Sequence, residues 1–162
     1  MQQFDLIIIG GGPGGYLCAE RAGKAGLRTA LLEKRALGGT CLNEGCIPTK
    51  SLLYCAKQYQ TMLHCEEYGI AAQNVSYDHA AAVVRKDGIV QTLVRGVGVS
   101  MKKHGVAVFS TEGKITGKTG DLFTVSAGAE SLFAPRLVLA SGYSAVVPPL
   151  PGVRDGLASG FV

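Results

Sequence analysis

The fold is decided by residues 4–33, which read FDLIIIGGGPGGYLCAERAGKAGLRTALLE. Phe4 to Ile9 is a short apolar run ended by glycines, the pattern of a buried parallel strand. Pro13 to Gly26 carries apolar residues spaced for a helix that packs on that strand, and Leu27 to Glu33 is a second apolar run. The stretch therefore predicts a right-handed βαβ unit, which begins an α/β fold with a central parallel sheet.

Two helices are predicted after this unit. Residues 34–46 are expected to form a polar, glycine-bearing loop. A helix then begins near Pro48 and carries apolar residues at helical spacing, which are Leu52, Leu53, Ala56, Tyr59 and Leu63. A link over residues 68–76 leads to a long helix with Asp78 as its cap. The apolar face of that helix is marked by Val83, Val90, Val94, Val97 and Met101. The helix itself is weakened locally by Gly88, Gly96 and Gly98.

The rest of the domain is predicted as strands. Val106 to Phe109 and Leu137 to Ala140 are short buried runs. Between them, residues 112–134 alternate short runs with Gly-Lys and Thr-Gly turn signals, which indicates a small antiparallel β-meander. Residues 148–152 then read PPLPG. We assign residues 1–147 to a Rossmann-like nucleotide-binding domain and 148–162 to a linker that leaves it.

The glycines at residues 10–15 satisfy the G-x-G-x-x-G pattern of dinucleotide sites. Gly10 permits the tight turn, Gly12 lets a pyrophosphate approach the backbone, and Gly15 lets the helix pack closely on the strand. The amino terminus of the helix faces the phosphates. Glu33 ends the next strand, where its carboxylate can accept hydrogen bonds from ribose hydroxyls. A glycine-rich turn without a ligand is the alternative, but the strand, the helix and the acidic residue all stand where a dinucleotide site needs them.

Composition limits the classes of function. The net charge is +4 without a long basic block, so we infer no nucleic-acid binding. The apolar runs are far too short to span a membrane, and the amino terminus lacks the basic start of a secretory signal. We therefore expect a cytoplasmic protein. In that compartment, the five cysteines indicate thiol chemistry or buried thiols rather than structural disulfides. We assign packing roles to Cys18, Cys55 and Cys65.

Residues 38–50 read GGTCLNEGCIPTK and contain two cysteines five positions apart. In an undistorted helix Cys41 and Cys46 would lie about 7.5 Å apart along the axis, beyond the reach of a disulfide. The turn between them must therefore be irregular, and Gly45 supplies the freedom. Pro48 suits a first helical turn and places Cys46 near a helix amino terminus, where a thiolate is favoured. Spacing leaves three possibilities open: a redox pair, two structural thiols, or a metal site. Cys55, Cys65 and His64 form no convincing second pair for a metal.

The same segment resembles the active-site signature of the pyridine nucleotide–disulfide oxidoreductases, and the resemblance extends from the glycine turn to the exit segment. The residues between the cysteines look most like those of the lipoamide branch. Glutathione and mercuric reductases share the Cys-x₄-Cys frame and are the alternative within the family. The resemblance implies FAD as the cofactor of this domain, NAD as the electron acceptor and no metal.

The family pattern implies roles for the matching positions. Cys41 would exchange with the substrate disulfide, Cys46 would lie against the flavin ring, and Lys50 would stand near the reactive flavin nitrogen. Electrons would pass from dihydrolipoamide to the cysteine pair, and through the flavin to NAD. The cofactor-binding positions implied by the resemblance are Gly10, Gly12, Gly14, Gly15, Glu33, Lys34, Gly39, Thr40, Lys50, Gly113, Ala140, Ser141 and Gly142.

Among these positions, Gly39 and Thr40 would approach the pyrophosphate, Glu33 the adenosine ribose and Gly113 the adenine. Two residues of the exit segment depart from the family pattern: Ser141 stands where threonine is usual, and Tyr143 replaces a smaller residue.

The 162 residues contain no second glycine motif, no later Gly-Asp contact to FAD and no dimerisation domain with its His–Glu pair. His64, His79 and His104 stand in other contexts. We therefore expect the NAD site and the contacts of a homodimer on domains outside this sequence, and no turnover by these residues alone. The implied partner is a lipoyl carrier domain of a 2-oxo acid dehydrogenase complex. The alternative in another class is a stand-alone FAD- or nucleotide-binding module.

Overall fold

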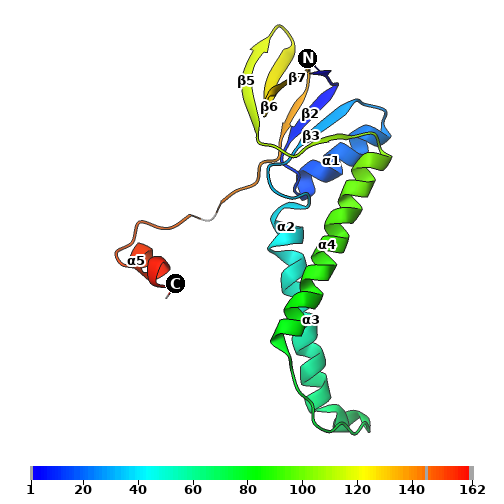
Figure 1. Cartoon of the computed structure of the whole chain (residues 1–162), viewed down its shortest axis with the longest axis vertical. Coiled ribbons are helices and arrows are strands. Elements are labelled where there is room, and N and C mark those ends of the chain that lie inside the picture. The colour runs from blue at the N-terminus through cyan, green and yellow to red at the C-terminus, as the bar shows by residue number, and fades with distance from the viewer. Residues whose placement is uncertain (1, 145, 161–162) are drawn as a thin grey trace.

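Four parallel strands form the central sheet, as predicted. In the computed structural model, which describes residues 2–144 and 146–160, these are β2 (Leu6–Ile9), β3 (Thr29–Leu32), β4 (Ala107–Phe109) and β8 (Leu137–Leu139). Their order across the sheet is β4-β3-β2-β8 (Figure 1). The last residues of neighbouring strands are in register, so all four strands end along one edge of the sheet.

A second sheet covers one face of the first. It contains β1 (Gln2–Gln3), β5 (Gly113–Thr119), β6 (Leu122–Ala127) and β7 (Glu130–Ala134) in the order β1-β7-β6-β5. The antiparallel pairing of β5, β6 and β7 confirms the predicted meander. β1 was not predicted. It pairs in parallel with β7, and two residues are too few to show a strand pattern.

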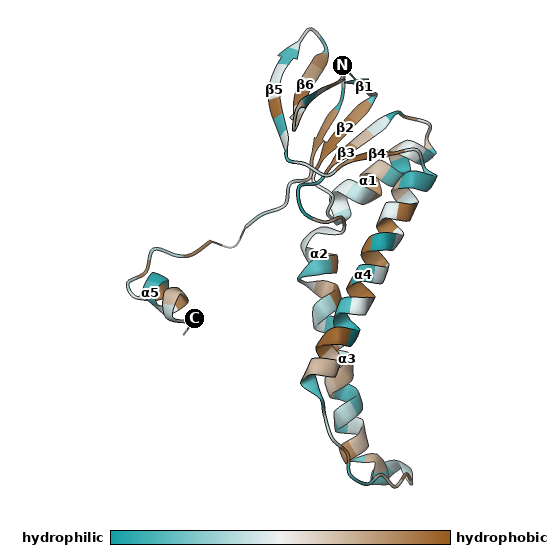
Figure 2. Ribbon diagram, viewed as in Figure 1, coloured by the Kyte–Doolittle hydropathy of each residue, from teal (hydrophilic) through white to brown (hydrophobic). Residues whose placement is uncertain are grey.

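The core lies on both faces of the parallel sheet because successive side chains of a strand point to opposite sides. Ile7, Ala30 and Leu32 pack against the meander, where Val125 and Leu132 are fully buried. On the other face, Leu6, Ile8 and Leu31 pack against helices together with Met101. The hydrophobic colour of β2 and β3 in Figure 2 reflects this double burial. Each fully buried Ile, Leu, Val or Met side chain among them contributes about 1.5–3 kcal/mol of hydrophobic stabilisation.

Helices α1 (Pro13–Lys24) and α4 (His79–Lys103) cover the second face. They are joined where the Ser100 hydroxyl donates to Glu20 Oε2 at 2.9 Å. The predicted cap of α4 is confirmed, because Asp78 Oδ1 accepts a hydrogen bond from the Ala81 amide at 3.0 Å. α4 runs unbroken through its three glycines. The residues predicted for its apolar face are buried or half-buried.

Helix α3 (Cys46–Leu63) packs beside α4, and the pair projects away from the two sheets (Figure 1). The apolar face predicted for α3 is only partly covered, since Leu53 is 63% and Leu63 47% exposed. Away from the sheets α3 has one neighbouring helix, which covers a narrow stripe of its surface. Ser51 is buried there and accepts a hydrogen bond from Arg85 Nη1 at 3.2 Å. The 3₁₀ helix η1 (Cys65–Tyr68) follows α3.

Two short helices lie in segments that the sequence presented as irregular. The predicted loop over 34–46 contains α2 (Gly39–Asn43), which is too short for apolar periodicity to be visible. The predicted linker over 148–162 contains α5 (Val153–Ser159), which lies apart from the sheets in Figure 1. Residues 161–162 of that linker lie outside the described residues, and the domain boundary at 147 stays a prediction. In the part of the chain that the structure describes, no helix has the length and apolar character to cross a membrane.

We expect Gly15→Ala and Gly88→Ala to have opposite effects on stability. A Cβ on Gly15 would lie 1.7 Å from the Gly10 carbonyl oxygen, so this variant should lose about 3 kcal/mol or more of unfolding free energy. Gly88 lies on the open side of α4, where a Cβ would meet nothing within 4 Å, so its variant should gain about 0.5–1 kcal/mol. Urea unfolding followed by circular dichroism measures both. Equal changes in the unfolding free energy of the two variants would contradict the close packing of α1 at Gly15.

Candidate functional site

A cleft of about 970 Å³ opens at the edge where the parallel strands end. Its walls come from the glycine turn after β2, the loop after β3, helix α2 with the start of α3, and the segment after β8. The lining residues are Gly12, Pro13, Gly14, Glu33, Lys34, Arg35, Ala36, Gly39, Thr40, Cys41, Asn43, Glu44, Gly45, Cys46, Ala140, Ser141, Gly142, Tyr143 and Ser144. Residues from three distant parts of the chain, 12–14, 33–46 and 140–144, thus meet around one space.

The glycine turn is shaped by close backbone contacts. Gly10 has φ +106°, and a Cβ there would lie 2.2 Å from the Ala140 carbonyl oxygen, so the turn closes tightly against the end of β8. Gly10 and Gly15 give the turn its shape without lining the cleft. Gly12 does line it, and the nearest atom to a Cβ on Gly12 would be the Gly39 Cα at 3.8 Å. Gly39, with φ +56°, packs against Gly12, because a Cβ on Gly39 would lie 2.7 Å from the Gly12 Cα.

The amino terminus of α1 supplies donors to the cleft. Pro13 occupies the first helical position and has no N–H group to leave unsatisfied. The next N–H groups have no partner inside the helix, and the helix dipole adds partial positive charge at this end. Gly12 and Gly39 lie beside these donors and carry no side chain. An anion therefore has room to approach the backbone closely. The chain thus fits a diphosphate at this position.

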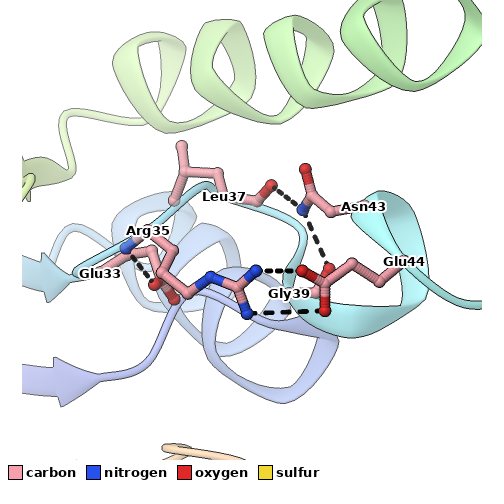
Figure 3. Close-up of polar contacts among 6 residues, drawn as sticks. All are labelled: Glu33, Arg35, Leu37, Gly39, Asn43 and Glu44. Atoms are coloured by element: carbon pink, nitrogen blue, oxygen red, sulfur yellow. Dashed lines mark hydrogen bonds and ion pairs between the residues drawn. The ribbon is translucent and has the colours of Figure 1, made fainter. Parts of the chain in front are cut away.

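Glu33 already holds the turn in place. Its Oε2 accepts a hydrogen bond from the Gly11 amide at 2.7 Å. Its Oε1 accepts a second one from the Arg35 amide at 2.8 Å, and Figure 3 marks this second bond. A carboxylate has about four lone-pair positions, so acceptors are left for hydroxyl groups of a ligand. Glu33 therefore combines a structural contact with the predicted capacity to bind a ribose.

Lys34 and Gly113 lie at the same corner of the sheet. Lys34 Nζ donates to Glu112 Oε1 at 3.3 Å, which links the loop after β3 to the start of β5. Gly113 does not line the cleft. A Cβ on it would lie 2.9 Å from Leu32 Cδ2, so glycine is needed here for packing against the end of β3. The structure thus brings Gly113 close to the cleft without making it part of the wall.

The loop that precedes α3 contains three polar cleft residues that sequence reasoning missed: Arg35, Asn43 and Glu44. The Arg35 guanidinium forms an ion pair with the Glu44 carboxylate, and this pair raises the pKa of Arg35, chiefly through the side-chain hydrogen bond (Figure 3). Asn43 Nδ2 donates to the carbonyl oxygens of Leu37 and Gly39 at 3.1 and 2.9 Å. An amide side chain four residues after a glycine pair was the available signal, since such loops leave carbonyl groups without helical partners.

The two cysteines stand on either side of a break between helices. Cys41 lies in α2, and Cys46 is the first residue of α3, which confirms its predicted place at a helix amino terminus. Gly45 occupies the break between the two helices. A Cβ on Gly45 would lie 3.0 Å from the Thr40 carbonyl oxygen. Both thiols line the cleft that also holds the glycine turn.

The electrostatics of the pair centre on Cys41. A hydrogen bond with the Cys46 side chain raises the pKa of the Cys41 thiol, and partial desolvation and the charge of Cys46 act in the same direction. The Lys50 ammonium opposes them by lowering this pKa, although Lys50 does not line the cleft. Outside the pair, Cys65 is buried and Cys18 and Cys55 are half-buried, as packing thiols would be. Within residues 2–144 and 146–160 no group of three metal-ligating side chains occurs.

Comparison with known proteins identifies the family. Residues 4–161 match the family described as pyridine nucleotide-disulphide oxidoreductase. The dihydrolipoyl dehydrogenase of Acholeplasma laidlawii is 42% identical over 162 residues, covering 99% of this chain and 47% of that protein. The Pseudomonas aeruginosa dihydrolipoyl dehydrogenase is 43% identical over 150 residues, covering 90% of this chain and 32% of that protein. The chain therefore spans less than half the length of these relatives.

A solved structure shares the architecture. The HOCl-induced flavoprotein disulfide reductase RclA from Escherichia coli, solved as its Cu(II) complex, superposes with a TM-score of 0.73 at 27% identity. The match covers 93% of this chain and 30% of that protein. This chain thus shares its α/β fold, with parallel and mixed sheets, with part of that flavoprotein disulfide reductase.

We expect the reactivity of Cys41 to respond in opposite directions to Cys46→Ala and Lys50→Gln. Cys46 raises the pKa of Cys41, so its removal should lower that pKa, increase the thiolate fraction below it and speed alkylation. Loss of Lys50 should raise the pKa further and slow the reaction. Iodoacetamide labelling of Cys41, followed by mass spectrometry over the pH range in which thiols titrate, measures both.

Lys57→Gln is the matched control, because it removes another exposed lysine from α3 about two helical turns away. It should leave the pH profile of Cys41 unchanged. A Cys41 profile that is the same in the wild type and in Cys46→Ala would refute the assigned coupling.

Proposed function

The chain belongs to the pyridine nucleotide-disulphide oxidoreductase family, and we propose that it is the FAD-binding, dithiol-bearing part of a dihydrolipoyl dehydrogenase. One observation carries this proposal: the glycine turn and the Cys41–Cys46 pair line the same cleft. A dinucleotide held at the turn could therefore extend to the thiols. The names of the curated relatives support the lipoamide branch over other members of the family.

The chain's own residues fit the FAD that we propose. Gly12, Gly39 and the first turn of α1 would hold the pyrophosphate, and the free lone pairs of Glu33 would accept from the adenosine ribose. Thr40, Lys34 and the residues 140–142 line the remaining walls. When bound, FAD would supply what thiols lack, the transfer of an electron pair onward to a nicotinamide acceptor as hydride.

The thiols would carry out the exchange with substrate. In the oxidised state, a substrate thiolate attacks Cys41 Sγ, the Cys41–Cys46 bond breaks, and Cys46 leaves as a thiolate. The second substrate thiolate then attacks the mixed disulfide and releases Cys41. The substrate becomes a disulfide, and the protein gains two electrons as a dithiol. The hydrogen bond with Cys46 favours a proton on the released Cys41.

The activity of the whole protein follows as part of the proposal. Dihydrolipoamide on a lipoyl carrier domain of a 2-oxo acid dehydrogenase complex would be the reductant, and NAD the acceptor, at a site outside these residues. The full-length protein would be a homodimer in the cytoplasm, a reducing compartment in which dithiol chemistry operates.

We expect the purified chain to bind added FAD and, after limited dithiol reduction, to show a long-wavelength charge-transfer band. The band should disappear in Cys46→Ser, since the thiol placed at the start of α3 is the proposed donor. Cys55→Ser is the matched control on the same helix, and the band should survive it, because Cys55 does not line the cleft. A visible absorption titration makes the measurement. Absence of flavin binding would count against the proposed cofactor site.

Gly12→Ala should separate binding from folding. Gly12 has φ −71°, which alanine adopts readily, and its Cβ would meet no protein atom closer than 3.8 Å. The unfolding free energy should therefore change by less than about 0.5 kcal/mol. The added methyl group would occupy the approach to the pyrophosphate, so FAD affinity should fall about ten-fold or more. Fluorescence titration gives the affinity, and Gly88→Ala controls for alanine substitution. Unchanged affinity would show that the cofactor does not approach Gly12.

A further inference from the structure

We propose that the Arg35–Glu44 ion pair is a clasp that holds the loop over residues 35–44 closed and thereby sets how long a bound dinucleotide stays in the cleft. This inference rests on the proposed function, because it needs FAD in the cleft described above. It assigns a positioning role to two residues that are absent from the predicted site.

The pair joins the two ends of the loop. Arg35 follows β3 by three residues, and Glu44 caps the carboxyl end of α2. Both nitrogens of the guanidinium fork reach the carboxylate, one to each oxygen, and Figure 3 shows the side chain reaching from the end of β3 to the end of α2. Both residues line the cleft. The ion pair therefore lies in the wall of the cleft and connects the two ends of the loop that forms this wall.

The middle of the loop is braced in a different way. Asn43 Nδ2 donates to two carbonyl groups within the loop, and the Gly38 amide donates to the Gly11 carbonyl at 2.8 Å. The Asn43 bonds hold the turn at residues 37–39, and the Gly38 bond holds this turn against the glycine turn at residues 10–15. Among the contacts of the described residues, Arg35–Glu44 is the side-chain pair that ties the first residue of the loop to the last.

Release of the ends would act on the cofactor residues between them. Gly39 and Thr40 lie in the middle of the loop, and Gly39 packs so closely on Gly12 that a Cβ would lie 2.7 Å from the Gly12 Cα. If the loop opens, Gly39 and Thr40 move away from the glycine turn and the proposed phosphate position loses one wall. The pair thus controls the width of the cleft through Gly39, without touching the phosphate position itself.

The exposure of the pair suits a clasp that opens and closes. The Arg35 side chain is 68% and the Glu44 side chain 50% exposed, so water screens the attraction between them. Exposed pairs change an equilibrium by a few-fold at most, and salt weakens them. A buried pair would lock the loop and block exchange of the cofactor. This pair instead slows its departure.

The experiment compares FAD dissociation from the 162-residue chain and three variants: Arg35→Gln, Glu44→Gln, and the exchange Arg35→Glu with Glu44→Arg. Each single variant should release FAD about two- to five-fold faster, and the exchange should restore the wild-type rate. High salt should accelerate release from the wild type and from the exchanged variant, but not from the single variants. Recovery of free-flavin fluorescence after rapid dilution gives the rates.

A second readout needs no cofactor. Backbone amides of residues 36–43 in the flavin-free chain should exchange with deuterium faster in both single variants and at the wild-type rate in the exchanged one. This protection reports closure of the loop itself. Unchanged protection in the single variants would show that the pair does not hold the loop and would overturn the proposal.

The controls are Lys86→Gln and Asp87→Asn, which remove the same charges from an ion pair on α4 outside the cleft. They should leave FAD release unchanged. Three further outcomes would overturn the clasp. If both single variants released FAD at the wild-type rate, the clasp would be refuted and the proposed FAD site would stand. Failure of the exchange to restore the rate would show that the charges act separately. If the wild-type chain bound no FAD, the proposed function and the clasp would both be refuted.

Discussion

The structure depends on the contact between the first turn of α1 and the end of β2. Gly15 lies against the Gly10 carbonyl so closely that a Cβ would overlap it, and a Cβ on Gly10 would lie 2.2 Å from the carbonyl oxygen of Ala140. These contacts set α1 directly over the edge of the parallel sheet, with its amino terminus at the cleft. Had any of these glycines a side chain, the helix would move outward, and its N–H groups would no longer converge with Gly12 and Gly39 on one place.

The second constraint is the short path from β3 to α3. Within fourteen positions, residues 33–46, the chain passes from the carboxylate that holds the glycine turn to the second thiol of the pair. Helix α2 and the break at Gly45 compress this path, so Glu33, Gly39 and both cysteines line one cleft. The nucleotide site and the dithiol site are therefore close along the sequence as well as in space. This arrangement lets a single extended cofactor serve both.

Sequence reasoning succeeded where a local pattern is long enough to be periodic or has a specific cap. The apolar runs predicted β2, β3, β4 and β8, the turn signals predicted the meander, and Asp78 marked the start of α4. It failed for β1 and α2, which are too short to show a period. It also overstated the apolar face of α3, because Leu53 and Leu63 have the spacing of buried residues but no neighbouring element covers them. Periodicity reports which residues could be buried, and the neighbours decide which of them are.

By itself, the sequence determined the order of the longer helices and strands, the glycine turn and the presence of a cysteine pair at a helix start, because each depends on residues within a few positions of one another. The tertiary structure decided which of those residues share a cleft. It excluded Gly113 and Lys50 from the wall while leaving Lys50 to act on Cys41, and it added Arg35, Asn43 and Glu44. It also gave the Glu33 carboxylate a backbone partner 22 positions away. Such contacts arise from the way α1, α2 and the sheet edge pack together, and no pattern within one segment encodes that packing.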